Sequence, residues 1–358
     1  MHERAARPVG FDRREFLKRI SLGGAGAALG GALWPDRAAA KAAVPEKSEV
    51  SLVAGKDRRE MVYRALKPFA GEVERAIGNR QVVIKANAGL ATPENAMYSS
   101  HADELRGVLD FLKDIHDRQV IIAEGTAGTM LDAFIGFQNY GYLPLEKEYN
   151  VKLIDANDQP YTQRHIYAAE HHPTPINIIN LFTDPEVYLI SAARMKTHNA
   201  VVGTYSLKNV AMGSPVCHWR KKVNEKSKMH GAPRENGGRE LSYNLFLLAE
   251  LGVRPDLSVI DAVEASEGDG PWGGTVVEHG VVVAGMDFVA ADRLCSELMG
   301  IDPKWMKYLE WCGQAGMGNF DLSNIKVNGP DYRKHVIKYK MNKNFDWQVA
   351  WIREQAEK

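Results

Sequence analysis

Cysteine is scarce in this sequence. The 358 residues contain three cysteines, Cys217, Cys295 and Cys312, which lie far apart and form no C-x-x-C pair. That pattern excludes a built-in iron–sulfur cluster and a structural zinc site held by cysteines. In an oxidising compartment Cys295 and Cys312 can form one disulfide; the alternative is that both are small, buried apolar residues.

The chain also lacks an excess of charge of either sign. Lys and Arg together number 45, and so do Asp and Glu. This balance gives no reason to expect nucleic acid or an anionic membrane surface as a partner. The Gly-containing segment Glu124–Thr129 does not have the G-x-G-x-x-G spacing of dinucleotide-binding turns, so a role for NAD is not supported.

The N-terminal apolar run, Ile20–Trp34, is too short to anchor the chain stably, because it falls below the about 18 residues of a membrane span. It follows the pair Arg13-Arg14 and precedes the small residues Ala38–Ala40. This order predicts that residues 1–40 form a twin-arginine signal, the alternative being an amphipathic N-terminal helix. We therefore expect the twin-arginine export machinery as a partner and a periplasmic protein, exported folded.

The remaining chain predicts an α/β fold with a mostly parallel, doubly wound sheet, in which strand-end loops form the site. Short apolar strands alternate with amphipathic helices, as in such folds. The strands are expected at 81–85, 120–123, 151–155, 187–190 and 257–261, and a hairpin partner at 276–284. The helices are expected at 60–77, 105–115, 130–140, 241–251, 287–299 and 305–312.

We expect three segments after the signal. Residues 41–80 comprise a lead-in, mobile over 41–55, and a helix. Residues 81–330 form the α/β domain, and residues 331–358 form a C-terminal arm packed on it.

Polar side chains follow several of these strands. Asn87 follows the first, Glu124 the second, and Lys196 and His198 the fourth. Ligands of open α/β sheets bind beyond the carboxyl ends of the strands, so these residues are expected to converge. The alternative is that each is a cap or turn residue. Asp261, at the end of a later strand, belongs to the same set.

Lys196, His198 and Lys208 carry the strongest chemical signal. A neutral histidine can accept a proton or bind a metal near pH 7. A desolvated lysine can act as a nucleophile or hold an anion. We expect Lys208 in the second turn of a helix that begins after Gly203-Thr204, with a solvated helix lysine as the alternative.

Further binding residues come from loops. Thr126 lies in the segment after Glu124, where backbone N–H groups can hold an anion. His230 lies in a basic loop and is a candidate contact or metal ligand beside His198. Asp269 belongs to a flexible acidic loop, Glu267–Pro271.

A set of motifs resembles the family known as domain of unknown function 362. They recur in the family's order over about residues 81–328 and are Ile84–Asn87, Lys196–His198, Leu207–Asn209, His230, Asp261, Gly268–Pro271, Ala284–Asp287 and Asp292. The family pattern has Pro where Ala86 stands. Some members carry ferredoxin-type cysteine clusters, which this chain lacks.

A second resemblance is to the N-terminal domain of nickel-pincer lactate racemases. In that family a His and a Lys ten positions apart flank a Gly-containing turn, and the Lys tethers a pyridinium-derived cofactor. His198, Gly203 and Lys208 have this arrangement. The family's histidine after the strand-end turn is replaced by Ala127, which argues against a two-base racemase mechanism.

Two functions follow. One is an enzyme with a metal or Lys-tethered cofactor and a small anionic substrate, in which His198, Lys208 and Lys196 act in catalysis. In that enzyme Asn87, Glu124, Thr126, His230 and Asp269 bind substrate or cofactor, and His198 and His230 are the metal ligands. The other is a periplasmic metal- or ligand-binding or accessory protein without catalysis.

Overall fold

A computed structural model describes residues 45–127, 132–168, 172–218, 220–231 and 238–356 of this chain. The strands are β1 (Ser48–Ala54), β2 (Gln81–Lys85), β3 (Val120–Glu124), β4 (Val151–Asp155), β5 (Tyr161–Tyr167), β6 (Pro173–Ile179), β7 (Val187–Thr197), β8 (Gly203–Thr204), β9 (Cys217–His218), β10 (Val223–Asn224), β11 (Leu257–Asp269), β12 (Gly273–Gly285) and β13 (Ile325–Asn328).

The α-helices are α2 (Arg58–Leu66), α3 (Ala70–Ile77), α4 (Ala102–Ile115), α5 (Ala133–Asn139), α6 (Leu145–Glu148), α7 (Ser206–Gly213), α8 (Arg239–Glu250), α9 (Phe288–Leu298), α10 (Lys307–Gln314) and α11 (Phe345–Ala356). Short 3-10 helices lie at Lys67–Phe69, Pro93–Tyr98, Ala156–Asp158, Asn180–Phe182, Glu225–His230, Pro303–Trp305, Leu322–Asn324 and Tyr332–His335. None of these helices is long and apolar enough to cross a membrane.

The central sheet has the order β13-β1-β12-β11-β7-β2-β3-β4, with β8 added beside β7. Strands β11, β7, β2, β3 and β4 run parallel, whereas β12 pairs antiparallel with both β11 and β1. The carboxyl ends of β7, β2 and β3 therefore meet at one edge. This confirms the predicted mostly parallel α/β sheet and places the polar strand ends together.

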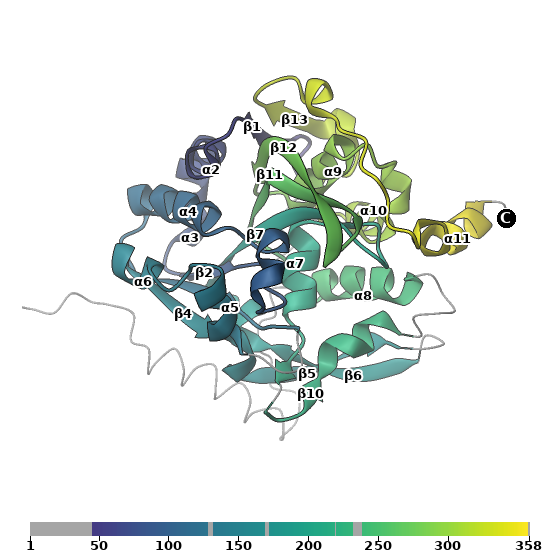
Figure 1. Cartoon of the computed structure of the whole chain (residues 1–358), viewed down its shortest axis with the longest axis horizontal. Helices are drawn as coiled ribbons and strands as arrows, with labels where there is room; N and C mark the ends of the chain where they lie inside the picture. Colours follow the sequence, from purple (N-terminus) through teal and green to yellow (C-terminus); the bar gives the residue numbers. More distant parts are fainter. Residues whose placement is uncertain (1–44, 128–131, 169–171, 219, 232–237, 357–358) are drawn as a thin grey trace, which may run out of the picture.

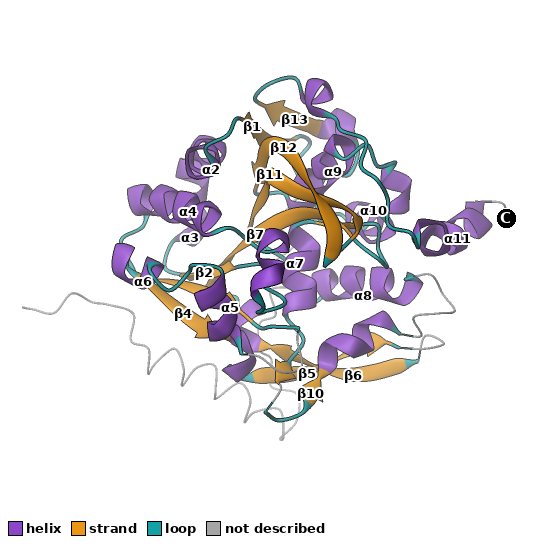
Figure 2. Ribbon diagram, in the orientation of Figure 1, coloured by secondary structure: helices purple, strands orange, loops and turns teal. Residues whose placement is uncertain are grey.

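Helices cover both faces of the sheet, because its central strands are apolar on both sides (Figures 1 and 2). In β7, Val187 and Leu189 belong to one apolar cluster, and Tyr188 and Ile190 belong to another. The first cluster includes buried side chains of α7, α8, α9 and α10, and the second includes those of α2, α3, α4 and α5. The fold is thus doubly wound.

The predicted mobile lead-in over 41–55 is wrong for its second half. Ser48–Ala54 form β1, which pairs with β12 and β13, strands more than 200 residues further along. The helix expected over 60–77 is interrupted at Pro68, because proline lacks the N–H that a continuous helix needs. The predicted signal segment lies outside the described residues.

Two strands are longer than predicted. β7 continues through Lys196 to Thr197, and β11 continues to Asp269, where the chain turns into the confirmed hairpin partner β12. The flexible acidic loop expected at Glu267–Pro271 is therefore wrong over residues 267–269, which are strand. The three cysteines are free and buried.

The C-terminal segment that follows β13 ends in α11 (Figure 1). Gln348 in this helix contacts the loop after β7. Its side-chain oxygen accepts from Val202 N at 2.6 Å, and its nitrogen donates to the His198 carbonyl at 3.0 Å. The arm thus holds the loop that carries His198.

Candidate functional site

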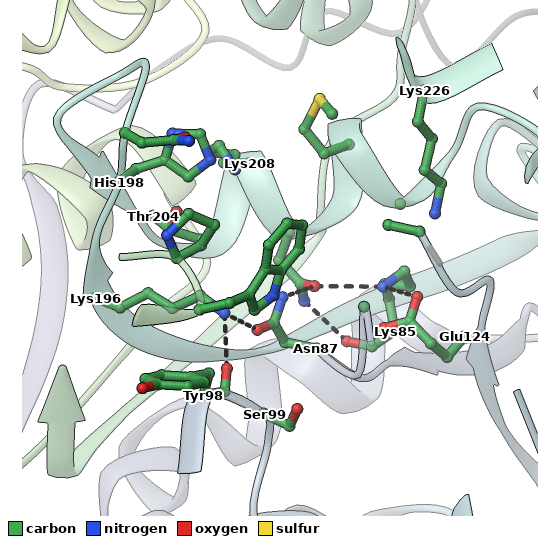
Figure 3. A pocket seen from close by; sticks show the side chains of 18 of the residues that line it. Lys85, Asn87, Tyr98, Ser99, Glu124, Lys196, His198, Thr204, Lys208 and Lys226 are labelled. Atoms are coloured by element: carbon green, nitrogen blue, oxygen red, sulfur yellow. Dashed lines mark hydrogen bonds and ion pairs between the residues drawn. The ribbon is translucent and has the colours of Figure 1, made fainter. Parts of the chain in front are cut away.

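A cavity of about 280 Å³ opens at the carboxyl ends of β2, β3 and β7 (Figure 3). The lysine, histidine and acidic residues on its walls are Lys85, Glu124, Lys196, His198, Lys208, Lys226 and His230. Lys196, His198 and Lys208 lie at one end of this view, and Lys85, Glu124 and Lys226 at the other. Four lysines therefore share one small cavity with a single carboxylate.

Lys85 and Glu124 form a buried ion pair at the ends of adjacent strands. Lys85 Nζ lies 2.7 Å from Glu124 Oε1, and both side chains are at most 2% exposed. The remaining Glu124 oxygen lone pairs accept from the backbone N–H groups of Ala88 and Gly125. Burial lowers the pKa of Lys85, and the Glu124 charge opposes that shift. The Glu124 carboxylate is therefore already paired with Lys85 and with two backbone N–H groups.

Lys196 is the next-to-last residue of β7, and two acceptors hold its amine. Its Nζ donates to Asn87 Oδ1 at 2.7 Å and to the Tyr98 carbonyl at 2.6 Å. The Asn87 side-chain nitrogen donates in turn to Asn209 Oδ1 at 3.0 Å, and Asn209 Oδ1 also lies 3.3 Å from Lys85 Nζ. Asn87 and Asn209 thus connect Lys196 to Lys85.

Lys208 is the third residue of α7 and is 7% exposed. Among the described residues, no side chain or carbonyl accepts a hydrogen bond from its amine, and no carboxylate pairs with it. Burial lowers its pKa to about 7. It lies in the first helical turn, one turn earlier than predicted, since Gly203-Thr204 form β8 and the helix begins at Ser206.

Asp292 of α9 fixes the position of the first turn of α7. Its two carboxylate oxygens accept from the backbone N–H groups of Ser206 at 2.9 Å and Leu207 at 3.0 Å. These are N–H groups of the first helical turn, which lack partners inside a helix. Burial raises the pKa of Asp292 to about 7. The carboxylate that caps the helix therefore also orients Lys208.

Lys226 and His230 come from the 3-10 helix Glu225–His230. Lys226 Nζ donates to the Gly125 carbonyl, with the Thr126 carbonyl further away at 3.4 Å. Burial lowers the pKa of Lys226 to about 8. Burial, followed by the charge of Lys208, lowers the pKa of His230 to about 4, so this imidazole is neutral near pH 7.

The hydrogen bond of His198 determines which ring nitrogen carries its proton. Its Nδ1 accepts from the backbone N–H of Ala200 at 3.0 Å. A neutral ring that accepts at Nδ1 has its proton on Nε2. Burial, followed by the charges of Lys208, His230 and Lys196, lowers the pKa of His198 well below its usual value. In this arrangement the His198 ring is a neutral hydrogen-bond donor.

The structure brings together six of the residues predicted for the site: Asn87, Glu124, Lys196, His198, Lys208 and His230. It does not bring in Asp269 or Thr126. Asp269 is exposed and accepts from Lys343 N at 3.1 Å. Thr126 is buried but is not on the cavity wall. Asp261 is also elsewhere, in a buried ion pair with Arg194.

Sequence reasoning missed Lys85, Lys226 and Trp272 as cavity residues. A signal for Lys85 existed, because a lysine directly after three apolar strand residues, Val82–Ile84, has little access to water when the sheet is covered on both faces. Lys226 lies in a segment without hydrophobic periodicity. Trp272 lies at the tip of the hairpin formed by β11 and β12, so it depends on an antiparallel pairing not visible locally.

The donor set of this cavity does not fit a metal ion held by protein side chains alone. In the part of the chain that the structure describes, no group of three or more His, Cys, Asp or Glu side chains is placed to hold a metal. His198 and His230 are two imidazoles among four lysines, and the lysine charges repel a cation. The His198 Nδ1 is already engaged with the backbone.

Comparison with known proteins identifies a family and a curated relative. The family model described as "Domain of unknown function (DUF362)" matches residues 82–297. Thylakoid-associated protein sll1697 of Synechocystis sp. is 22% identical over 174 residues, which are 46% of this chain and 47% of that protein. The chain therefore spans about half the length of this curated relative.

Among solved structures, the lactate racemase apoprotein from Thermoanaerobacterium thermosaccharolyticum matches with a TM-score of 0.41 and 12% identity. The match covers 72% of this chain and 59% of the racemase. The family match includes the candidate site, because residues 82–297 contain all four cavity lysines and both cavity histidines. This chain belongs to the DUF362 family.

Proposed function

We propose that the cavity binds a small organic anion and that this is the functional site of the protein. The observation that carries the proposal is the imbalance of charge on its walls, where four buried lysines face one glutamate. That glutamate is already paired with Lys85 and accepts from two backbone N–H groups. Burying a charge without a partner costs free energy. A bound anion would lower that cost by pairing with the lysines.

The size of the cavity limits the ligand. A volume of about 280 Å³ is at or below the lower end of the range for drug-sized ligands. A carboxylate compound of a few carbon atoms fits this space, and Lys196, Lys208 and Lys226 surround it with donors. The neutral His198 ring adds an N–H donor, which suits an anion or a hydroxyl oxygen better than a cation.

Binding of such an anion is expected to draw protons into the protein. The pKa of Lys208 is lowered to about 7 and that of Lys226 to about 8, so both are partly neutral at slightly alkaline pH. A bound anion favours their charged forms and raises both pKa values. Anion binding should therefore be accompanied by proton uptake near pH 8.

Isothermal titration with oxalate, a small dianion, tests the proposal. Wild type should bind it, and proton uptake appears as a heat that depends on the ionisation enthalpy of the buffer. Lys208→Met should weaken binding by about tenfold or more, the effect of losing one charged hydrogen bond. The matched control is Lys56→Met, which removes an exposed lysine with no partner among the described residues. Equal affinity in wild type and Lys208→Met would refute the site.

A cofactor tethered to a lysine remains a proposal for this cavity. Lys208 fits that role best, since its amine has no partner among the described residues, and such a group would supply reactivity that amino-acid side chains lack. A metal in this cavity would need donor atoms from that group, because the described side chains alone do not form a metal site. Mass spectrometry of intact protein from its own host, with metal analysis, tests both. A mass equal to the polypeptide alone and no bound metal would refute them.

We also propose, from the sequence, that residues 1–40 direct export of the folded protein to the periplasm. Arg13-Arg14 followed by the apolar run supports this. N-terminal sequencing of protein recovered from a periplasmic fraction should begin near Lys41. Replacing Arg13 and Arg14 by lysine should leave the protein in the cytoplasm, whereas unchanged export would refute a twin-arginine route.

A further inference from the structure

We infer that Lys208 forms an imine with the carbonyl carbon of a 2-oxo acid held in this cavity. The inference rests on the proposed anion site, is an alternative to a cofactor tethered at the same amine, and adds a chemical class of ligand and a covalent step. Its basis is geometric: one lysine amine faces a small cavity with no partner among the described residues, while three other lysines on the same walls are engaged.

The contacts of the four lysines separate their roles. Lys85 is paired with Glu124, and Lys226 is held by backbone carbonyls of the loop after β3. Lys196 is fixed between Asn87 Oδ1 and the Tyr98 carbonyl. Attack on a carbonyl needs an amine whose lone pair can turn toward the carbon atom. Lys208 alone of these lysines has that freedom among the described residues.

The surroundings also supply a neutral amine at ordinary pH. Burial lowers the pKa of Lys208 to about 7, so about half of the molecules carry the neutral amine at pH 7. An exposed lysine would be almost entirely protonated at that pH. Desolvation in a buried pocket is a general way to activate a lysine for imine formation.

The step balances without any redox partner. The Nζ lone pair of Lys208 attacks the carbonyl carbon, the C=O π electrons move to oxygen, and one proton passes from nitrogen to that oxygen. The resulting carbinolamine loses its C–O bond with one further proton, and water leaves as the C=N bond forms. No electrons are gained or lost.

The other cavity groups suit the carboxylate of the same ligand. A 2-oxo acid carries its carboxylate directly beside the carbonyl, so a charge partner must lie close to the nucleophile. Lys196 is on the same side of the cavity as Lys208 (Figure 3). The neutral His198 ring can donate from Nε2 to the carbonyl or carbinolamine oxygen. These contacts distinguish a 2-oxo acid from a neutral aldehyde or ketone.

Reductive trapping tests the inference. Wild-type protein is incubated with pyruvate and sodium cyanoborohydride, digested, and mapped by mass spectrometry. The expected product is a single adduct on the peptide that contains Lys208, heavier by the mass of pyruvic acid less one oxygen atom. Excess oxalate should suppress it several-fold by competing for the site. Acetone, a carbonyl compound without a carboxylate, should give at least tenfold less adduct.

Lys208→Arg is the discriminating variant, because arginine keeps the positive charge but does not form the imine under these conditions. It should still bind oxalate, which confirms an intact anion site, and should lose the adduct. Oxalate binding to wild type without any pyruvate adduct, or with the adduct on Lys196, overturns the imine at Lys208 and leaves the anion site standing. Absence of both oxalate binding and adduct in wild type overturns the two proposals together.

Discussion

Replacing Lys208 by methionine should make the protein more stable near neutral pH when no anion is present. Methionine has similar length and shape but no charge to desolvate. Lys208 has no acceptor or carboxylate partner among the described residues, and burial alone accounts for the lowering of its pKa. Removing this side chain therefore removes a cost of folding and breaks no ion pair there.

The size of the effect follows from the shift in pKa, from 10.5 to about 7. Between these values the unfolded chain binds a proton that the folded protein does not, so the free energy of unfolding of wild type rises with pH. Below pH 7 the full cost applies, and it fades as the pH approaches 10.5. At 1.36 kcal/mol per pKa unit the upper bound is about 5 kcal/mol, and water in the cavity should reduce it to about 2–4 kcal/mol.

Urea unfolding followed by tryptophan fluorescence measures this difference, in buffers free of phosphate and carboxylates. Lys208→Met should exceed wild type in free energy of unfolding by about 2–4 kcal/mol near pH 6 and by much less near pH 10. Saturating oxalate at the lower pH should stabilise wild type and reverse the order. Lys56→Met is the control and should follow wild type throughout. A gap independent of pH, or a variant less stable than wild type at the lower pH, would refute the reasoning.

Three further substitutions test the supports of the site. Asp292→Ala leaves two backbone N–H groups at the start of α7 without acceptors, and urea unfolding should show a loss of about 2–4 kcal/mol; a loss below about 0.5 kcal/mol would contradict the capping role. Gly213→Ala places a Cβ 2.2 Å from Lys85 Cε, so it should displace the buried ion pair and weaken oxalate binding. An oxalate affinity equal to that of wild type in isothermal titration would contradict this packing. Asp261→Asn removes the carboxylate that pairs with both Arg194 and Arg58, and leaves Arg194 with the more distant Glu264 at 3.5 Å. It should lower the thermal midpoint through a loss of about 3–5 kcal/mol, whereas an unchanged midpoint would show that these pairs contribute little.

The parts of the fold that were predicted well are those with a local pattern. β2 and β4 have the predicted limits, since each is a short apolar run bounded by turn residues. β7 was predicted too short because Ala192–Thr197 contains small and charged residues with weak strand preference. These residues are strand through pairing with β11 and β8, which sequence periodicity does not reveal.

The site was predicted to the extent that it follows from parallel topology. Asn87, Glu124, Lys196 and His198 converge because the carboxyl ends of neighbouring parallel strands lie at one edge. The chemical role of each of these residues could be assigned only from the three-dimensional structure. The proton of His198 is assigned by the Ala200 N–H, a contact made by the shape of one loop. Such contacts have no signature in composition or spacing.

The hydrogen bonds from Gln348 to the loop after β7 have a consequence for how the protein is made. Gln348 lies 150 positions beyond His198, so part of the support of that loop comes from a segment synthesised much later. A nascent chain still emerging from the ribosome can form β2, β3 and β7 before this brace exists. The cavity should therefore be completed only after α11 has been synthesised, and a bulky fusion directly after α11 is a poor choice for preparing protein with an intact cavity.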